Sequence, residues 1–499
     1  MDALFWVRFG FASLCLLAVY LGVRKPQQAL SRLQEFFFEP TSAANLGLLR
    51  VAVFYLIYCN ACNSTASWYA SLSPTFLKLP RGWLWLGELY PLLLRCVRPT
   101  EWLFILASGL ALIGLFTRVS TIAASLLAVW VMGIPNFYFK IGHNSHVLVL
   151  CALVLACSPS GHAISIDALI QRWNGKAPPA RDVAYTVPIR FCWLLLGTSY
   201  LFPGLWKLWE GGDLWINGHK LQVELGLKWA QLPDFVPSLR VDHYPRVLRF
   251  FGTMTLVFEV GFFFALFSRR ARIIAGLFAT FFHLGVGIAM DIWFNLWFPL
   301  IVLIDLPELL SVVPFSRLRA PLLQLWGWLE ERVRALVPRL RLPVSEVFSP
   351  PLPSGSFAAG SVLVLGMFVA GLGPIDSWPI ALYPHFSDRA ARAPRTSMGL
   401  EFVIQDAAGH ESVLKSNFYP LGDSASAFRI VRAAIDLKAK HRQAALDEHV
   451  ALLARLVREN NPPTTPGTHL FIYRFDFHVD PAERGGDRRT RSLIAETAL

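Results

Sequence analysis

The sequence predicts an all-α polytopic membrane bundle of about 9–10 transmembrane helices, followed by a small α+β extracytoplasmic domain at the C-terminal end. Hydrophobic residues make up 54% of the 499 residues and charged residues only 16%, whereas soluble domains carry about a quarter of charged residues. Apolar stretches alternate with short charged loops up to about residue 372, and the remainder has the composition of a soluble protein. This pattern excludes a disordered chain, a collagen and a small disulfide scaffold.

Ten stretches have the apolarity of a membrane-spanning helix, which needs about 20 residues. Two of them, 144–158 and 292–306, are short, so the number of spans lies between about eight and ten. The first, 4–23, has no small-residue cleavage site after it, and we expect a retained helix rather than a signal peptide. The stretches are 4–23, 45–62, 100–117, 119–138, 144–158, 188–206, 248–267, 271–290, 292–306 and 355–373.

Basic loops set the expected orientation. No nucleic-acid motif accompanies the net charge of +12, so we assign the surplus to loops that face the anionic inner leaflet, and expect no nucleic acid as a partner. The alternate loops that are richer in Lys and Arg are predicted to be cytoplasmic, which places both termini outside. The stretch 313–345 alternates apolar and basic residues and should lie on the inner membrane surface, with a calmodulin-binding helix as the alternative. The basic residues of these loops are Arg24, Lys25, Arg32, Arg118, Arg172, Lys176, Arg181, Arg269, Arg270 and Arg272, with further arginines in 317–341.

The chain divides into an N-terminal helix with a linker (1–36), a transmembrane domain (37–373) and a soluble α+β domain (374–499). In the last of these, LEFVIQ and ESVLKS flank a turn-rich joint and predict a hairpin. A helix of about 30 residues is expected from Ser424, because apolar residues recur at helical spacing. The segment HLFIYRFDFHV alternates with the period of a strand.

Lys207 is the most informative ionisable residue of the predicted spans. It lies between Trp206 and Trp209, just after Pro203-Gly204. An amine in apolar surroundings holds its proton less tightly, which makes Lys207 a candidate general base. The alternative is a lysine that extends to the membrane interface beside a tryptophan belt.

Four further ionisable residues occur within spans or at their ends, where burial is costly. His143 precedes Asn144 and lies one turn before His146, but two histidines without a third ligand nearby do not predict a metal site. Glu259 and His283 fall within successive spans, where antiparallel packing places them near each other. They indicate either a proton path or ligand contact, or an ion pair that ties helices together. The fourth is Arg50, which begins the second span.

Cys59 and Cys62 form a Cys-x-x-Cys at the end of the second span. A redox dithiol is one interpretation, but the strand–helix context of thioredoxin-like motifs is missing, so an incidental pair is the other.

Several segments occur in a characteristic order: FFEPTSAANLGLLRVAVFYL with Arg50, GLFTRVS, GHNSHVLVL, SPSGHAISIDAL with Ser165 and Asp167, GLWKLWEGGDLWINGH, the spans with Glu259 and His283, FVIQDAAGHESVL and IYRFDFHVDPAERGGDRR. Together they resemble the vitamin K-dependent γ-carboxylase family and its bacterial relatives, which share the HTTM domain. The similarity runs from about residue 37 to about residue 490.

The resemblance implies a catalytic role for two residues. Lys207 in GLWK matches the family's catalytic lysine, and His143 matches its essential histidine, although Gly142 stands where the family has an Asn. The family's extracytoplasmic cysteine has no evident counterpart, and the larger carboxylases extend beyond the position of Leu499. We expect Trp206, Asn144, Glu259 and His283 to contact the quinol.

The family's chemistry implies that neutral Lys207 deprotonates a reduced vitamin K-type quinol. Oxidation by O2 then generates a strong base that removes the γ-proton of a glutamate, and CO2 is added, while His143 steadies the charged intermediate. The expected partners are the lipid bilayer, the quinol and an extracytoplasmic glutamate-containing peptide. A non-catalytic membrane binding or assembly protein of the same fold is the alternative. A transporter is disfavoured, because the sequence has no inverted repeat.

Overall fold

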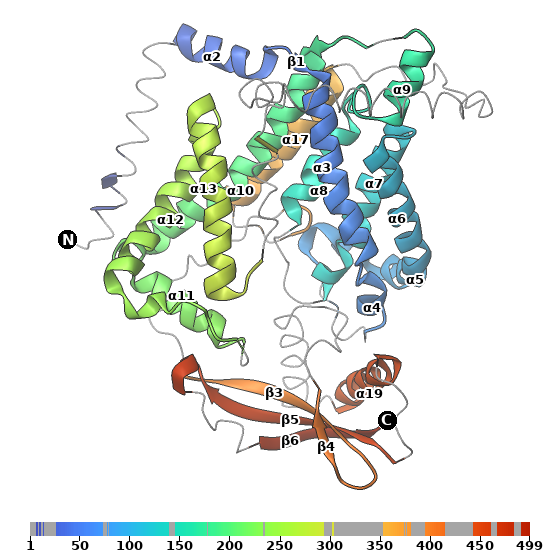
Figure 1. Cartoon of the computed structure of the whole chain (residues 1–499), viewed down its shortest axis with the longest axis vertical. Coiled ribbons are helices and arrows are strands. Elements are labelled where there is room, and N and C mark those ends of the chain that lie inside the picture. The colour runs from blue at the N-terminus through green and yellow to red at the C-terminus, as the bar shows by residue number, and fades with distance from the viewer. Residues whose placement is uncertain are drawn as a thin grey trace, which may run out of the picture.

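Long apolar helices form an upright bundle, and a small sheet lies beyond one end of it (Figure 1). The structure is a computed structural model. The residues it describes are 26–72, 79–138, 145–232 apart from 177, 235–293, 353–373, 395–414, 443–460, 467–483 and 491–499, with a few isolated positions between them.

Five helical segments among the described residues are long and apolar enough to cross a membrane: 43–62, 117–137, 245–265, 269–290 and 355–372. The chain is therefore a multi-pass membrane protein. The helices of the bundle are α3 (Ala43–Cys62), α6 (Val97–Ile113), α7 (Thr117–Val131), α8 (His146–Ala156), α10 (Val183–Ile216), α12 (Pro245–Ala265), α13 (Arg269–Met290) and α17 (Pro353–Leu372).

The predicted spans agree with these helices except in length. The expected span 100–117 falls on α6, and 188–206 falls within α10, which continues to Ile216. The expected spans 4–23 and 292–306 lie largely outside the described residues, and the expected surface helix 313–345 lies entirely outside them.

Helix α10 runs through the centre of the bundle and packs against α8, α12 and α17. Small residues permit the close approach that stabilises helix pairs in membranes. A Cβ at Gly204 would lie 2.8 Å from Glu259 Cβ, and one at Gly371 would lie 2.3 Å from the Phe202 ring. These two glycines therefore bring α12 and α17 onto α10.

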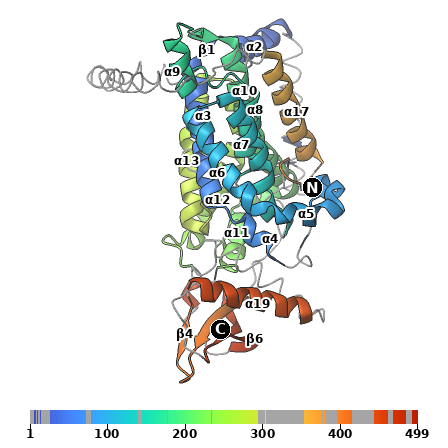
Figure 2. The same cartoon turned by 90° about the vertical axis from the view of Figure 1, so that its right-hand side faces the viewer.

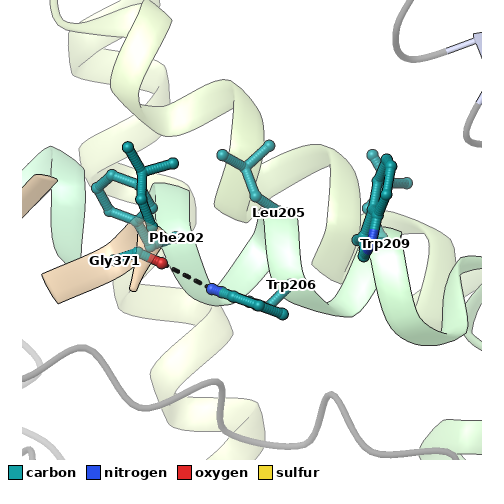
Figure 3. A pocket seen from close by; sticks show the side chains of 7 residues that line it. Phe202, Leu205, Trp206, Trp209 and Gly371 are labelled. Carbon is teal, nitrogen blue, oxygen red and sulfur yellow. Dashed lines mark hydrogen bonds between the residues drawn. The ribbon is translucent and has the colours of Figure 1, made fainter. Parts of the chain in front are cut away.

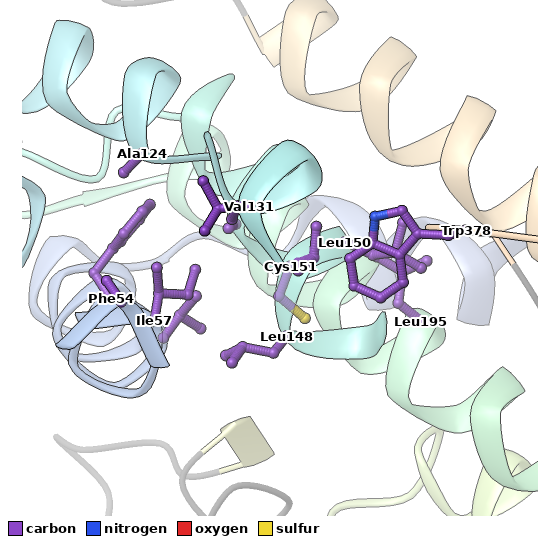
Figure 4. Packing of buried hydrophobic residues seen from close by; sticks show 14 of the residues in the cluster. Phe54, Ile57, Ala124, Val131, Leu148, Leu150, Cys151, Leu195 and Trp378 are labelled. Atoms are coloured by element: carbon purple, nitrogen blue, oxygen red, sulfur yellow. The ribbon is translucent and has the colours of Figure 1, made fainter. Parts of the chain in front are cut away.

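Between α3, α7, α8 and α10 lies a continuous apolar core (Figure 4). Its members include Ile57, Val131, Leu150 and Leu195, each of which is at most 1% exposed. Trp378 joins this core and donates from its indole nitrogen to Val129 O, 2.7 Å away.

Short elements close the ends of the bundle. Helix α2 (Pro26–Phe38) lies across one end of the bundle in Figure 1 and exposes Leu30, Leu33 and Phe38. Exposed apolar side chains on such a helix are typical of a helix in the membrane interface. The others are β1 (Thr41–Ser42), which pairs with β2 (Arg181–Asp182), α4 (Ala66–Ala70), α5 (Tyr90–Arg95), α9 (Ile166–Trp173), α11 (His219–Trp229), and 3-10 turns at Arg81–Leu89, Ile134–Phe137 and Val241–His243.

The C-terminal region is a small α+β unit, as predicted. Its antiparallel sheet has the order β4-β3-β5-β6, and α19 packs on it (Figure 2). The predicted hairpin is β3 with β4, and the predicted alternating strand is β5. The first part of the helix expected from Ser424 lies outside the described residues, and the residues described from Gln443 on form α19. The bounds are β3 Thr396–Gln405, β4 Glu411–Val413, α19 Gln443–Asn460, β5 His469–His478, a 3-10 turn at Pro481–Glu483, and β6 Arg491–Ala498.

Two polar contacts join this sheet to the end of the bundle near α11. Ser397 Oγ donates to Ala230 O over 2.6 Å, and Arg240 pairs with Asp480 over 2.9 Å. The C-terminal unit is thus attached at the bundle end toward which the second half of α10 runs.

Candidate functional site

Lys207 lies on α10, three residues after Gly204, and points at α12. Its side chain is buried, with 4% exposure, and its ammonium pairs with Glu259 Oε1. The face of the Trp215 ring lies 5.2 Å from Nζ, a distance at which an aromatic ring attracts a cation. The sequence left open whether Lys207 extends to the interface, and the structure places it inside the bundle.

Glu259 is equally enclosed, at 6% exposure. Its Oε1 receives Lys207, whereas its Oε2 is buried without a hydrogen-bond partner among the described residues. Buried carboxylate oxygens nearly always have a donor, because an unsatisfied one retains its full desolvation penalty. The carboxylate therefore presents one open acceptor inside the bundle.

A second polar pair lies on the same side of α10. Tyr200, about two turns before Lys207, has its hydroxyl 2.6 Å from His283 Nε2 on α13. The Tyr200 ring packs on Phe258 and Phe262 of α12, with centroids 5.1 Å and 4.5 Å away. We call Lys207, Glu259, Tyr200 and His283 the buried polar row. Polar groups at this depth are costly, so they indicate a functional site more often than polar groups in a soluble core.

Trp206 lies on a different face of α10. Its indole nitrogen donates to Gly371 O of α17 over 2.7 Å (Figure 3). There it lines an apolar pocket of about 270 Å³ between α10 and α17. The structure thus separates Trp206 from Lys207, although the two are neighbours in sequence. The other lining residues are Phe202, Leu205, Leu208, Trp209, Gly371 and Leu372.

His143 and Asn144 lie outside the described residues, so their predicted roles stay predictions. Their neighbour His146 is buried at 2% exposure, with its ring edge-on to Trp378 at a centroid distance of 4.7 Å. No group of three or more His, Cys, Asp or Glu among the described residues is arranged to hold a metal ion. Cys59 and Cys62 are free thiols, half-buried and exposed, respectively.

Arg50 is fully buried on α3, beside the loop that joins α8 to α9. Its two terminal nitrogens donate to main-chain carbonyls, one to Ser160 O over 3.1 Å and the other to Ile164 O. Gly114 has a φ of +70°, and a Cβ there would lie 2.4 Å from Arg50 Nη1. Only a glycine therefore lets this loop pass over the guanidinium.

The Ser-x-Asp segment next to Arg50 joins two helices. Ser165 caps α9 by accepting from Ala168 N over 2.9 Å. Asp167 accepts from Thr117 N over 2.6 Å and from Phe116 N over 3.0 Å, at the start of α7. These contacts are helix caps and hold loops in place. The Arg50 site is thus structural in character.

Sequence reasoning missed Tyr200 and the pairing of Lys207 with Glu259. It expected Glu259 and His283 near each other, and the structure gives each of them a partner on α10, Lys207 and Tyr200, respectively. The available signal was the spacing of Tyr200 and Lys207, which puts them on one side of a helix. A tyrosine within an apolar run otherwise resembles a core residue.

Comparison with known proteins supports a family assignment. The model of the HTTM domain matches residues 38–307, more than half of the chain. No curated protein and no solved structure matches the sequence. The matched region contains the whole buried polar row and the Arg50 site. The chain therefore belongs to the HTTM domain family, that of the vitamin K-dependent γ-carboxylase-like proteins.

Proposed function

We propose that the protein is a membrane-embedded, γ-carboxylase-like enzyme. It would couple oxidation of a reduced, vitamin K-type quinol by O2 to removal of a glutamate γ-proton and addition of CO2. One observation carries this proposal: a lysine matching the family's catalytic lysine is buried in a membrane domain against a carboxylate with an open oxygen.

The residues present suit a quinol. Its hydroxyl groups donate hydrogen bonds, and Glu259 Oε2 is a buried acceptor without a partner among the described residues. Its isoprenoid part is apolar, as is the pocket that contains Trp206, although this pocket lies on a different face of α10 from Lys207. When bound and oxidised, the quinol supplies a base strong enough to remove a γ-proton. No protein side chain is a strong enough base to do this at neutral pH.

The chain's own task is the first proton transfer. Lys207 accepts a hydroxyl proton only as the free amine, whereas the pair with Glu259 also exists as ammonium and carboxylate. Transfer of one proton from Nζ to Oε1 converts that ion pair into an amine and a carboxylic acid without a change in total charge. Low-dielectric surroundings favour such neutral forms, because the desolvation cost of two ions is removed.

Other parts of the chain have supporting roles in this proposal. His143 would steady the negative charge that develops after deprotonation, and Asn144 would bind the quinol beside it. The basic loops indicate that the soluble domain lies outside the cytoplasm. A glutamate-containing peptide would then approach from that side.

The test uses the full chain in lipid nanodiscs with reduced phylloquinone, O2, bicarbonate and a glutamate peptide. Quinone epoxide and carboxylated peptide are measured together. Lys207→Ala should lower epoxide formation by about 10²–10⁴-fold, the usual contribution of a general base. Lys228→Ala, which changes a lysine of α11 outside the buried polar row, should retain it. Absence of epoxide from the wild-type protein would refute the function, and unchanged turnover in Lys207→Ala would remove the proposed base.

A further inference from the structure

Glu259 differs from the other buried acidic partner of a lysine in this protein. Lys220 and Glu224 form an ion pair within one helix, α11, with side-chain exposures of 0% and 5%. Glu224 is not left with an orphaned buried oxygen, whereas Glu259 has Oε2 in that state. Both pairs are enclosed, so enclosure alone does not explain the open oxygen of Glu259.

The open oxygen is built into the helix packing. Glu259 belongs to α12 and reaches across to α10, which Gly204 brings close: a Cβ there would lie 2.8 Å from Glu259 Cβ. The contact uses Oε1 alone. A carboxylate held in this way by one lysine is not fully satisfied as an anion, because a carboxylate accepts at two oxygens.

Protonation reduces this deficit. A carboxylic acid carries no charge, so an oxygen without a donor costs less than it does in the anion, and the neutral acid suits a site with a single partner better. The nearest proton source is the ammonium of Lys207, which contacts Glu259 directly. The other titratable groups of the row, Tyr200 and His283, are hydrogen-bonded to each other.

We propose that Glu259 takes the proton of Lys207 and so converts Lys207 into the free amine that the reaction needs. This inference rests on the proposed function, because it assigns Glu259 the role of setting the protonation state of the base. The Nζ–H bond breaks and an O–H bond forms on Glu259, with no other reactant. After Lys207 accepts a hydroxyl proton from the quinol, the pair carries two protons and one net positive charge. Glu259 is thus a positioning residue that acts through Lys207.

The first experiment detects the proton itself. Infrared spectra of the full chain in nanodiscs at neutral pH, without ligand, should contain the carbonyl stretch of a protonated carboxyl group. Glu259→Gln should lose this band, and the matched variant Glu224→Gln should keep it. If the Gln variant does not fold, Glu259→Asp should shift the band instead. A band missing from the wild-type protein, or unchanged in the Glu259 variants, would mean that Glu259 is ionised and would overturn the inference.

The second experiment measures the consequence for turnover. Glu259→Gln should lower kcat for epoxide formation by about 10–10²-fold, with a smaller change in KM, because Lys207 loses the carboxyl group that both takes its proton and holds its side chain in position. Glu259→Asp should recover most of kcat, and Glu224→Gln should retain it. A purely structural Glu259 would lower the yield of folded protein but leave kcat per folded molecule unchanged, which contradicts the inference.

The two experiments separate the inference from the function on which it rests. If the infrared band behaves as expected but the wild-type protein forms no epoxide, the proposed function fails and the proton transfer stands. If epoxide forms but Glu259→Gln has full kcat, the function stands and the role of Glu259 fails.

Discussion

Arg50 and Lys207 are both buried basic side chains of the same bundle, but their partners differ in kind. Arg50 gives its two terminal nitrogens to the main-chain carbonyls of Ser160 and Ile164. Lys207 is paired with Glu259, a side chain of another helix that retains an open oxygen. One basic group is thus fixed by the backbone of a loop, and the other shares its site with a group that can itself take a proton.

The difference separates a charge with one protonation state from a pair with two. A carbonyl cannot accept a proton at neutral pH, and arginine stays charged in proteins, so the Arg50 site has a single charge state. A lysine and a carboxylate in contact have two states that differ by the position of one proton. Burial is therefore a poor guide to function by itself, and the chemistry of the partner is the better guide.

The largest effect on stability should come from Arg50→Met. It leaves two buried carbonyls without donors, so we expect unfolding to become about 3–5 kcal/mol easier. Thermal unfolding in detergent micelles measures this change. Arg172→Met on α9, an exposed position, is the control and should stay within about 0.5 kcal/mol of the wild-type protein. A similar small change for Arg50→Met would mean that its carbonyl contacts contribute little.

Gly114→Ala should damage the same site without touching the arginine. The positive φ of +70° is unfavourable for alanine, and the new Cβ would meet Arg50 Nη1 at 2.4 Å. We expect a loss of about 2–4 kcal/mol in the free energy of unfolding. Gly261→Ala on α12 is the matched control, because a Cβ there has nothing within 4 Å. Equal stability of the two variants would show that the loop adjusts freely.

Lys207→Met should cost less, about 1–3 kcal/mol in the same unfolding measurement, because Glu259 remains as the neutral acid and leaves no uncompensated buried charge. Adding Glu259→Leu should return stability to within about 1 kcal/mol of the wild-type protein, since well-packed apolar residues replace buried ion pairs without loss. For Arg50 no such second substitution exists, because its carbonyl partners belong to the backbone. Additive losses in the double variant would show that the two side chains are not coupled.

The sequence was sufficient for the elements but not for their pairing. Apolar runs located α3, α12, α13 and α17 because a span's length and hydropathy are local properties. The strand β3 was likewise visible from the turn-rich joint that follows it, and β5 from its alternation.

Which side chain meets which across helices is a tertiary property. Glu259 was expected near His283, and the sequence did not reveal that its partner is Lys207, because Gly204 draws α12 onto α10. Trp206 and Lys207 are adjacent in sequence, yet on a helix they differ by about 100° in direction. They therefore reach different neighbours, and the sequence could assign neither of them its partner.

The smallest effect concerns His162, in the loop whose carbonyls bind Arg50. The Tyr185 hydroxyl donates to Pro179 O over 3.0 Å, so its oxygen accepts from His162 Nδ1, also 3.0 Å away. Burial lowers the pKa of His162 below its usual 6.5, although Asp182 acts in the opposite direction. The unfolded chain therefore binds a proton at this residue more readily than the folded one.

His162 should thus stabilise the fold above about pH 6.5, and this contribution should be lost as the pH falls below that value. Melting temperatures of the wild-type protein and of His162→Gln, recorded through this range, check the expectation. The variant should show the shallower acid decline, whereas Arg172→Met should follow the wild-type curve. A parallel decline in His162→Gln would assign the acid sensitivity to other groups. Neither Arg50 nor His162 would then make the stability of this loop depend on pH.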